Sequence, residues 1–235
     1  MGNGNSDKIL ILLPGLEGSG LLFEPLLNHL KGVKTIVVSY PKDKKMGYKE
    51  LIRYVKELIP KDTHFSLLGE SFSGPLSIMI ASENLPYLDS LILVGTFIKN
   101  PVKYIPEWVR YLICPPIMIF AKPFILLKAY FSGVRDSYLL NLIKRSYSGL
   151  KLSVLSLRIK EILSVNATED LKKTNVPIYY FRGKRDNVVS KKNLNEILEV
   201  KCDVNVRFLD TWHLILQTKP KECADIIETI LEMVI

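Results

Sequence analysis

Cysteine is scarce in this chain, and its few cysteines are not arranged to bind a metal. Only three occur in 235 residues, Cys114, Cys202 and Cys223, and no two of them have the short spacing that zinc sites require. Three thiols also cannot form two disulfide pairs. We therefore expect reduced cysteines, without a disulfide framework or a zinc site, as is typical of a reducing compartment.

Signals for membrane insertion or export are also missing. The first residues lack the basic start, apolar middle and small-residue cleavage site of a signal peptide, so we expect a cytoplasmic protein. The uncharged stretch 111–121 contains Pro115 and Pro116 and is much shorter than the roughly 20 residues that span a bilayer. We expect no transmembrane segment and interpret this stretch as a helix pair that is buried or faces the substrate.

Patterns for nucleotide or nucleic-acid binding are lacking as well. Segment 14–20 is rich in glycine, but no Gly-Lys-Ser/Thr ending follows it, and its glycines are not spaced as in the dinucleotide-binding fingerprint. The chain is basic, with a formal net charge of +8, yet no nucleic-acid-binding motif accompanies that charge. We therefore favour neither nucleotides nor nucleic acid as ligands.

The sequence does contain a regular alternation of strand and helix patterns. Short apolar runs typical of buried strands are followed by segments whose apolar residues recur every three or four positions, as in helices. The expected strands are 8–13, 33–40, 65–68, 88–94, 176–181 and 204–209. The run 33–40 has the pattern of a strand buried on both faces. This order predicts an α/β fold with a mostly parallel six-stranded sheet and helices on both faces.

The alternation is interrupted once. Between residues 99 and 171 no strand pattern occurs and at least three helices are expected, so we predict a helical cap inserted into a core of residues 1–98 and 172–235. Residues 97–160 contain eleven Lys or Arg against two Asp or Glu, a net charge of +9, which accounts for the whole positive excess of the chain. A solvated surface and a binding surface for an acidic partner both explain that charge.

A serine with the surroundings of a nucleophile lies between the third strand and the next helix. Residues 69–73 read Gly-Glu-Ser-Phe-Ser, which is the Gly-x-Ser-x-Gly pattern except that Ser73 replaces the last glycine and Gly74 follows one residue later. Such a short motif can also be an ordinary loop. The strand before it and the helix after it favour Ser71 as a nucleophile, and we expect the Ser73 hydroxyl to point along the helix, away from the strand ends.

Two further residues follow later strands, where ligands bind in open α/β sheets. Asp186 comes after the fifth expected strand and His213 after the sixth. A serine hydroxyl becomes nucleophilic when an imidazole takes its proton, and a carboxylate fixes the tautomer of that imidazole. We predict a catalytic triad of Ser71, His213 and Asp186, with Asp210 as a distant second choice for the acid.

With these residues in this order, the chain resembles the α/β-hydrolase family. The resemblance covers nearly the whole chain outside the expected cap and rests on segments 13–20, 69–75, 183–186 and 213–217. It implies that the backbone N–H groups of Leu16 and Phe72 form the oxyanion hole and that neither a metal nor an organic cofactor is needed. Pro14 stands where many members have a histidine, and the leading antiparallel hairpin of the family is missing. The chain is thus similar to small hydrolases with a Pro-Gly-x-x-Gly-x-Gly loop, and the resemblance implies no particular substrate.

From the residues and the resemblance together, we expect a serine hydrolase that cleaves a carboxylic ester or thioester through an acyl-enzyme intermediate. An acyltransferase would use the same acyl-serine, and a non-catalytic binding protein on a hydrolase scaffold is a third interpretation, because a fold alone does not establish activity. The apolar, basic segment 97–160 favours an apolar acyl chain joined to an anionic group. Acyl carrier protein, coenzyme A and an anionic lipid surface are the acidic partners we consider.

Overall fold

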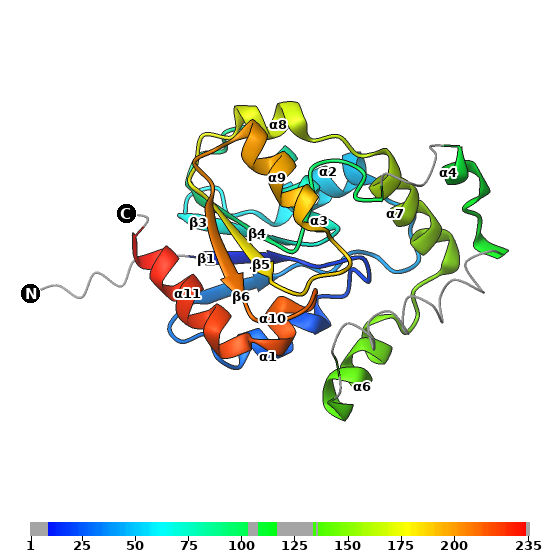
Figure 1. Ribbon diagram of the computed structural model, residues 1–235, viewed down its shortest axis with the longest axis horizontal. Coiled ribbons are helices and arrows are strands. Elements are labelled where there is room, and N and C mark those ends of the chain that lie inside the picture. Colours follow the sequence, from blue (N-terminus) through cyan, green and yellow to red (C-terminus); the bar gives the residue numbers. More distant parts are fainter. Residues whose placement is uncertain (1–8, 103–107, 117–133, 135, 234–235) are drawn as a thin grey trace, which may run out of the picture.

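The structure, a computed structural model, describes residues 9–102, 108–116, 134 and 136–233. Its centre is one six-stranded sheet in which every neighbouring pair of strands is parallel, in the order β2-β1-β3-β4-β5-β6 (Figure 1). The strands are β1 Ile9–Leu13, β2 Lys34–Val37, β3 Phe65–Glu70, β4 Leu88–Val94, β5 Ile178–Gly183 and β6 Asn205–Leu209. The predicted α/β architecture and its parallel sheet are confirmed.

Helices cover both faces of this sheet, as predicted (Figure 1). In β1 the odd-numbered residues pack into one apolar layer and the even-numbered residues into the other, because successive side chains of a strand point to opposite faces. The first layer is covered by α2 Tyr48–Leu58, α3 Ser73–Ala81, α8 Thr168–Lys173 and α9 Lys191–Val200. The second is covered by α1 Glu24–Leu27, α10 Ile215–Thr218 and α11 Pro220–Met233, and the short 3-10 helix η1 Leu21–Phe23 precedes α1.

Strand β2 is shorter and more exposed than the sequence predicts. It lies at the edge of the sheet, and its four residues are exposed or half-buried, whereas the run 33–40 predicts a strand buried on both faces. Ile36 packs against one apolar layer and Val37 against the other, which explains the apolar run. Only β1 pairs with this strand, so no second strand of the described residues lies along its outer edge.

The segment predicted as a cap contains α4 Val109–Leu112, α6 Ser137–Ser146 and α7 Leu152–Ser164, and α8 begins inside it and ends beyond residue 171. A single antiparallel bridge between Lys99 and Asn166 brings the two ends of this segment together. In Figure 1, α6 and α7 lie beyond the carboxyl ends of the strands. The stretch 117–121 of the predicted helix pair lies outside the described residues, and the cap boundaries stay a prediction. Among the described helices, none is both long and apolar enough to cross a bilayer.

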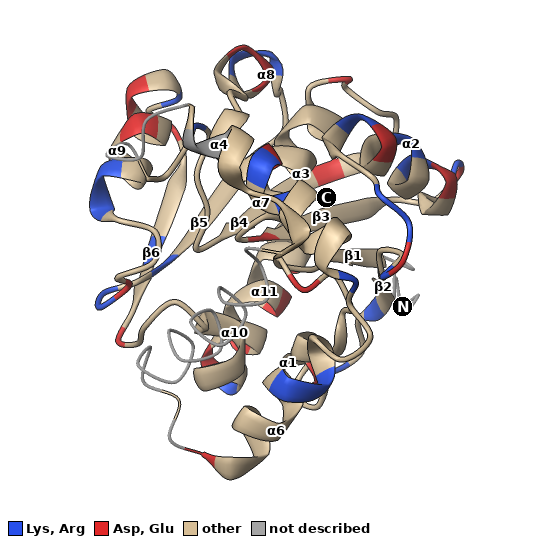
Figure 2. Cartoon of the chain, turned by 90° about the vertical axis from the view of Figure 1, so that its right-hand side faces the viewer, with Lys and Arg blue, Asp and Glu red and all other residues tan. Residues whose placement is uncertain are grey.

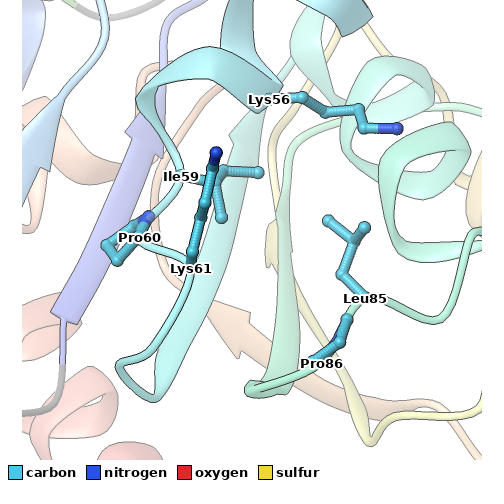
Figure 3. A pocket seen from close by; sticks show the side chains of 6 residues that line it. All are labelled: Lys56, Ile59, Pro60, Lys61, Leu85 and Pro86. Carbon is cyan, nitrogen blue, oxygen red and sulfur yellow. The ribbon is translucent and has the colours of Figure 1, made fainter.

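A pocket of about 280 Å³ opens at the other end of the sheet (Figure 3). Its lining consists of residues that precede β3 and β4: Lys56, Ile59, Pro60, Lys61, Leu85 and Pro86. The predicted triad residues follow their strands instead. The pocket is therefore separate from the candidate active site.

Candidate active site

Ser71 occupies a sharp turn between β3 and α3. Its φ of 49° lies in the left-handed region, which is uncommon for residues other than glycine and often marks functional sites. Its N–H donates to the carbonyl of Val94 over 2.9 Å, and its own carbonyl accepts from Thr96 Oγ1 over 2.6 Å. A Cβ atom on Gly74 would lie 1.9 Å from Thr96 Oγ1, so only glycine allows this close approach. These contacts fix the turn and leave the Ser71 side chain half-buried.

Two hydrogen bonds join Ser71 to the other predicted triad residues. Ser71 Oγ lies 3.1 Å from His213 Nε2, and His213 Nδ1 lies 2.9 Å from Asp186 Oδ2. An ionised carboxylate only accepts hydrogen bonds, so Nδ1–H donates to Asp186 and Nε2 is left to accept from the serine hydroxyl. The structure thus brings together three residues separated by up to 142 positions in the sequence.

The carboxylate of Asp186 is buried and fully hydrogen-bonded. Its Oδ1 accepts from the backbone N–H groups of Val188 and Val189 over 2.9 and 3.0 Å. Burial alone would raise the pKa of Asp186, but the charge of His213, its hydrogen bond and the two backbone donors outweigh burial and lower the pKa. An ionised Asp186 can stabilise the positive charge that His213 acquires when it takes a proton.

The remaining His and Asp candidates lie apart from this chain of hydrogen bonds. Asp210 is exposed and pairs with Arg185 over 3.2 Å, so it does not replace Asp186. His64 pairs with Asp89 over 2.6 Å at the amino end of β3. His29 bonds a backbone carbonyl of α1. The described residues contain no group of three His, Cys, Asp or Glu side chains that could hold a metal ion.

Ser73 points in a different direction from the one predicted. Its hydroxyl does not run along the helix, because it donates to the carbonyl of Pro14 at the end of β1 and lies 2.7 Å from the hydroxyl of Tyr40. As the first residue of α3, Ser73 lies beside the loop that follows β1. It is fully buried, and these two partners engage its oxygen. The residue that replaces the motif glycine therefore holds the neighbouring loop.

Hydrogen bonds engage several carbonyl groups of the glycine-rich loop 14–20. The carbonyl of Gly15 accepts from Gly18 N–H over 3.0 Å, and that of Gly18 accepts from Tyr40 N–H over 2.7 Å. The carbonyl of Leu16 accepts from Arg158 Nη1 over 2.9 Å. Within the described residues, no hydrogen bond engages the N–H groups of Leu16 and Phe72. Two free N–H groups in adjacent loops are what an oxyanion hole requires, and their catalytic role stays a prediction.

Two buried carboxyl groups flank the nucleophile turn and the glycine-rich loop. Burial, followed by the charge of Glu17, raises the pKa of Glu70 to about 7, although a hydrogen bond from Gln217 opposes the change. Burial also raises the pKa of Glu17, against the lowering effects of nearby backbone N–H groups and of Arg158. Glu17, Glu70 and Arg158 were not predicted as site residues from the sequence. Glu17 lies in the glycine-rich loop and Glu70 ends β3 directly before Ser71, and only this closeness to the two motifs could have drawn attention to them.

No protein-family model and no curated protein sequence matches the chain, but solved structures resemble it. A lipase-esterase related protein from Clostridium acetobutylicum ATCC 824 is 16% identical, with a TM-score of 0.77 over 97% of this chain and 96% of that one. An enol-lactonase from Burkholderia xenovorans LB400 is 15% identical, with a TM-score of 0.78 over 99% and 94%. MenH from S. aureus is 16% identical, with a TM-score of 0.79 over 98% and 96%. The parallel sheet and these likenesses show that the chain has the α/β-hydrolase fold.

Proposed function

We propose that the chain is a serine hydrolase that cleaves a carboxylic ester or thioester through an acyl-enzyme intermediate. The observation that carries the proposal is the unbroken path of hydrogen bonds from Ser71 through His213 to Asp186. Two similar structures are of a lipase-esterase related protein and an enol-lactonase, which supports an ester as the bond that is cleaved. Similarity of fold alone would not establish an activity.

The proposed reaction assigns a residue to each step. Ser71 Oγ attacks the carbonyl carbon while its proton passes to His213 Nε2. The negative oxygen of the tetrahedral intermediate accepts from the Leu16 and Phe72 N–H groups, each of which is worth about 3 kcal/mol of transition-state stabilisation. His213 then returns the proton to the departing oxygen or sulfur, which leaves an acyl group on the serine. Water, deprotonated by His213, releases the acid and restores the hydroxyl.

Apolar residues from the segment after β4 favour an apolar acyl chain as substrate. One apolar cluster joins Ile113 with α7 and reaches Leu16 in the glycine-rich loop. A second joins α6 with η1 and reaches Leu214, the neighbour of His213. Tyr147 contacts both clusters. The half-buried members Leu16, Tyr147 and Leu214 are the ones we propose to contact hydrocarbon, because burying apolar area is favourable at roughly 25 cal/mol per Å².

An anionic group on the substrate is the less direct part of the proposal. Among the described residues of segment 97–160, Lys144 and Arg145 are exposed on α6 and Lys151 is exposed just before α7. Arg158 is buried, so it does not belong to a basic surface. Basic residues also occur on α2 and α9 (Figure 2). Lys144 and Arg145 are adjacent exposed basic residues of the segment predicted as a cap, so we propose that this pair captures acyl carrier protein, coenzyme A or an anionic lipid surface.

The central test is labelling with a fluorophosphonate probe, which reacts with activated serines. Wild type should be modified at Ser71, as identified by peptide mapping, and Ser71→Ala should lose the label while keeping its circular dichroism spectrum. A folded wild type that never reacts, or that reacts at another residue, contradicts the proposal.

The anionic group is tested separately by salt dependence. Exposed charges are screened beyond about 10 Å at 0.1 M salt, so salt should lower kcat/KM for an acyl-coenzyme A or acyl-carrier substrate more than for a neutral ester of equal chain length. The variant Lys144→Glu/Arg145→Glu should remove that difference. Equal salt sensitivity for both substrates would eliminate the anionic group and leave the hydrolase proposal intact.

A further inference from the structure

Arg158 is the largest fully buried side chain among the described residues. It extends from α7 to the loop that follows β1, where Nη1 donates to the carbonyl of Leu16 over 2.9 Å. Nη2 donates to the carbonyl of Pro41 over 3.3 Å. An arginine is almost never fully buried unless it is paired, because removing its charge from water is costly. The placement of Arg158 therefore calls for an explanation, and the triad chemistry does not supply one.

The guanidinium lies close to the glycine-rich loop. A Cβ atom on Gly18, whose φ is +70°, would come within 2.3 Å of Arg158 Nη1. The guanidinium carbon is 5.5 Å from the ring centre of Tyr40, within range of a cation–π interaction. The hydroxyl of Tyr40 in turn bonds Ser73, which holds the carbonyl of Pro14. Arg158 is thus one end of a chain of contacts that joins α7, the loop and the nucleophile turn.

Glu17 supplies the opposite charge inside the same loop. Its side chain is buried, and its charge raises the pKa of Arg158 while burial, the larger effect, lowers it. Arg158 Nε and Glu17 Oε1 are buried without a hydrogen-bond partner among the described residues, so the attraction between the two opposite charges offsets part of the cost of burying them. Breaking such a pair by removing one member is strongly destabilising, because it leaves the other charge uncompensated.

The direction of the Leu16 N–H depends on the peptide groups around it. In a trans peptide the C=O and N–H groups point in opposite directions. The bond from Gly18 N–H to the Gly15 carbonyl therefore points the Leu16 N–H away from Gly18, and Arg158 fixes the next peptide group through the Leu16 carbonyl. No other donor to the Leu16 carbonyl occurs in the part of the chain that the structure describes. A loop with three glycines has many accessible conformations, so this clamp restricts a flexible segment.

We infer that Arg158 is a positioning residue of the oxyanion hole: from α7 it clamps the Leu16 carbonyl, so that the Leu16 N–H is held where the oxyanion develops. The inference rests on the proposed function, because it assigns Arg158 a role in that site. Arg158 reaches the reacting atoms only through the loop. The hole is therefore complete only when α7 is docked, which couples the segment between β4 and β5 to the chemistry.

The test compares four variants in steady-state kinetics on a neutral ester. Arg158→Met removes the clamp and the charge, and Glu17→Gln/Arg158→Met removes the clamp while restoring charge balance. Arg158→Lys keeps the charge but not the forked donor. Lys160→Gln is the matched control, because it removes one charge from the same helix at a half-exposed position. We expect the first two variants to lower kcat about 10- to 100-fold with KM nearly unchanged, Arg158→Lys to be intermediate, and Lys160→Gln to resemble wild type.

A transition-state analogue separates positioning from general loosening. A trifluoromethyl ketone adds to Ser71 and places a negative oxygen in the hole, so its affinity should fall by the same factor as kcat/KM in the Arg158 variants. A folded Arg158→Met with wild-type kcat and inhibitor affinity overturns the inference. Should Arg158→Met not fold, unchanged values in Arg158→Lys overturn it instead. Failure of wild type to react with fluorophosphonate at Ser71 would instead refute the proposed function, so the two failures are distinguishable.

Discussion

Glu70 offers the sharpest physical prediction, because it is a buried carboxyl group whose pKa of about 7 lies close to the pH of a cell. It ends β3 directly before Ser71, and its Oε1 accepts from Gln217 Nε2 over 2.9 Å. Its Oε2 and the Oε1 of Gln217 are both buried without a hydrogen-bond partner among the described residues. A proton on Oε2 would turn one of these two unpartnered acceptors into a donor. This geometry agrees with the pKa of about 7 that burial and then the charge of Glu17 give Glu70.

The sign of the effect on stability follows from proton binding. The pKa of Glu70 is about 7 in the folded chain against an ordinary value of 4.5, so between these values the folded chain holds a proton that the unfolded chain has lost. The free energy of unfolding therefore falls as pH rises through this window. At about 1.36 kcal/mol for each pH unit, the contribution is about 3 kcal/mol, fully present below pH 4.5 and lost above pH 7. Asp186, whose pKa is lowered, acts below this window.

Urea unfolding of wild type and Glu70→Gln from about pH 5 to about pH 9 measures this contribution. Glutamine cannot titrate, and its amide can both accept from Gln217 and donate to it. The unfolding free energy of wild type relative to Glu70→Gln should therefore fall by about 3 kcal/mol across the range. Glu57→Gln, an exposed change on α2, is the control and should show a constant difference. A wild-type minus Glu70→Gln difference that varies by less than about 1 kcal/mol would show that Glu70 is ionised throughout.

Two further predictions concern the triad and the loop. Asp186→Asn should lower kcat about 10⁴-fold with little change in the thermal midpoint, because asparagine can favour the wrong tautomer of His213. Asp210→Asn should stay active. The reverse pattern would move the acid role to Asp210. Gly18→Ala and Gly32→Ala both place alanine at a φ near +70°, which costs roughly 1–2 kcal/mol of stability. Only the alanine at position 18 also collides with Arg158. In urea unfolding, Gly18→Ala should therefore lower the free energy of unfolding by about 1–3 kcal/mol more than Gly32→Ala, and only Gly18→Ala should lower kcat. Equal effects of the two changes would contradict the clamp.

The sequence predicted the sheet well, because strands buried on both faces appear in the sequence as continuous apolar runs. Every residue of β4 lies in the run 88–94, since that strand has neighbours on both sides and helices on both faces. The same pattern misled at β2, where two apolar layers meet an edge that no described strand covers. Strand order cannot be read from local pattern either, because it is decided by which crossovers pack together. The triad residues could be chosen because their types, order and positions after strands are local properties.

The residues that support the triad could not be chosen in this way. Arg158 looks like one of eleven basic residues in a segment of high positive charge, and its burial becomes visible only when α7 lies on a loop 142 positions earlier. Glu70 and Gln217 flank Ser71 and His213 as ordinary polar residues until β3 and α10 are side by side. In each case the meaning of the side chain depends on a partner from another element, and a single sequence without the fold does not name that partner.

The two supporting contacts hold different parts of the site. The Glu70 and Gln217 pair joins the strand of the nucleophile to the helix that follows the histidine, and Arg158 joins α7 to the loop of the oxyanion hole. The first contact includes a group whose charge changes near neutral pH, whereas an arginine stays charged throughout that range. Raising the pH should therefore weaken the contact of Glu70 with Gln217 before it weakens the contact of Arg158 with the loop of the oxyanion hole. The fluorophosphonate labelling rate and the affinity for the trifluoromethyl ketone can be measured on the same samples from about pH 6 to about pH 9. Both quantities should change less with pH in Glu70→Gln than in wild type. In Lys160→Gln they should change as much as in wild type.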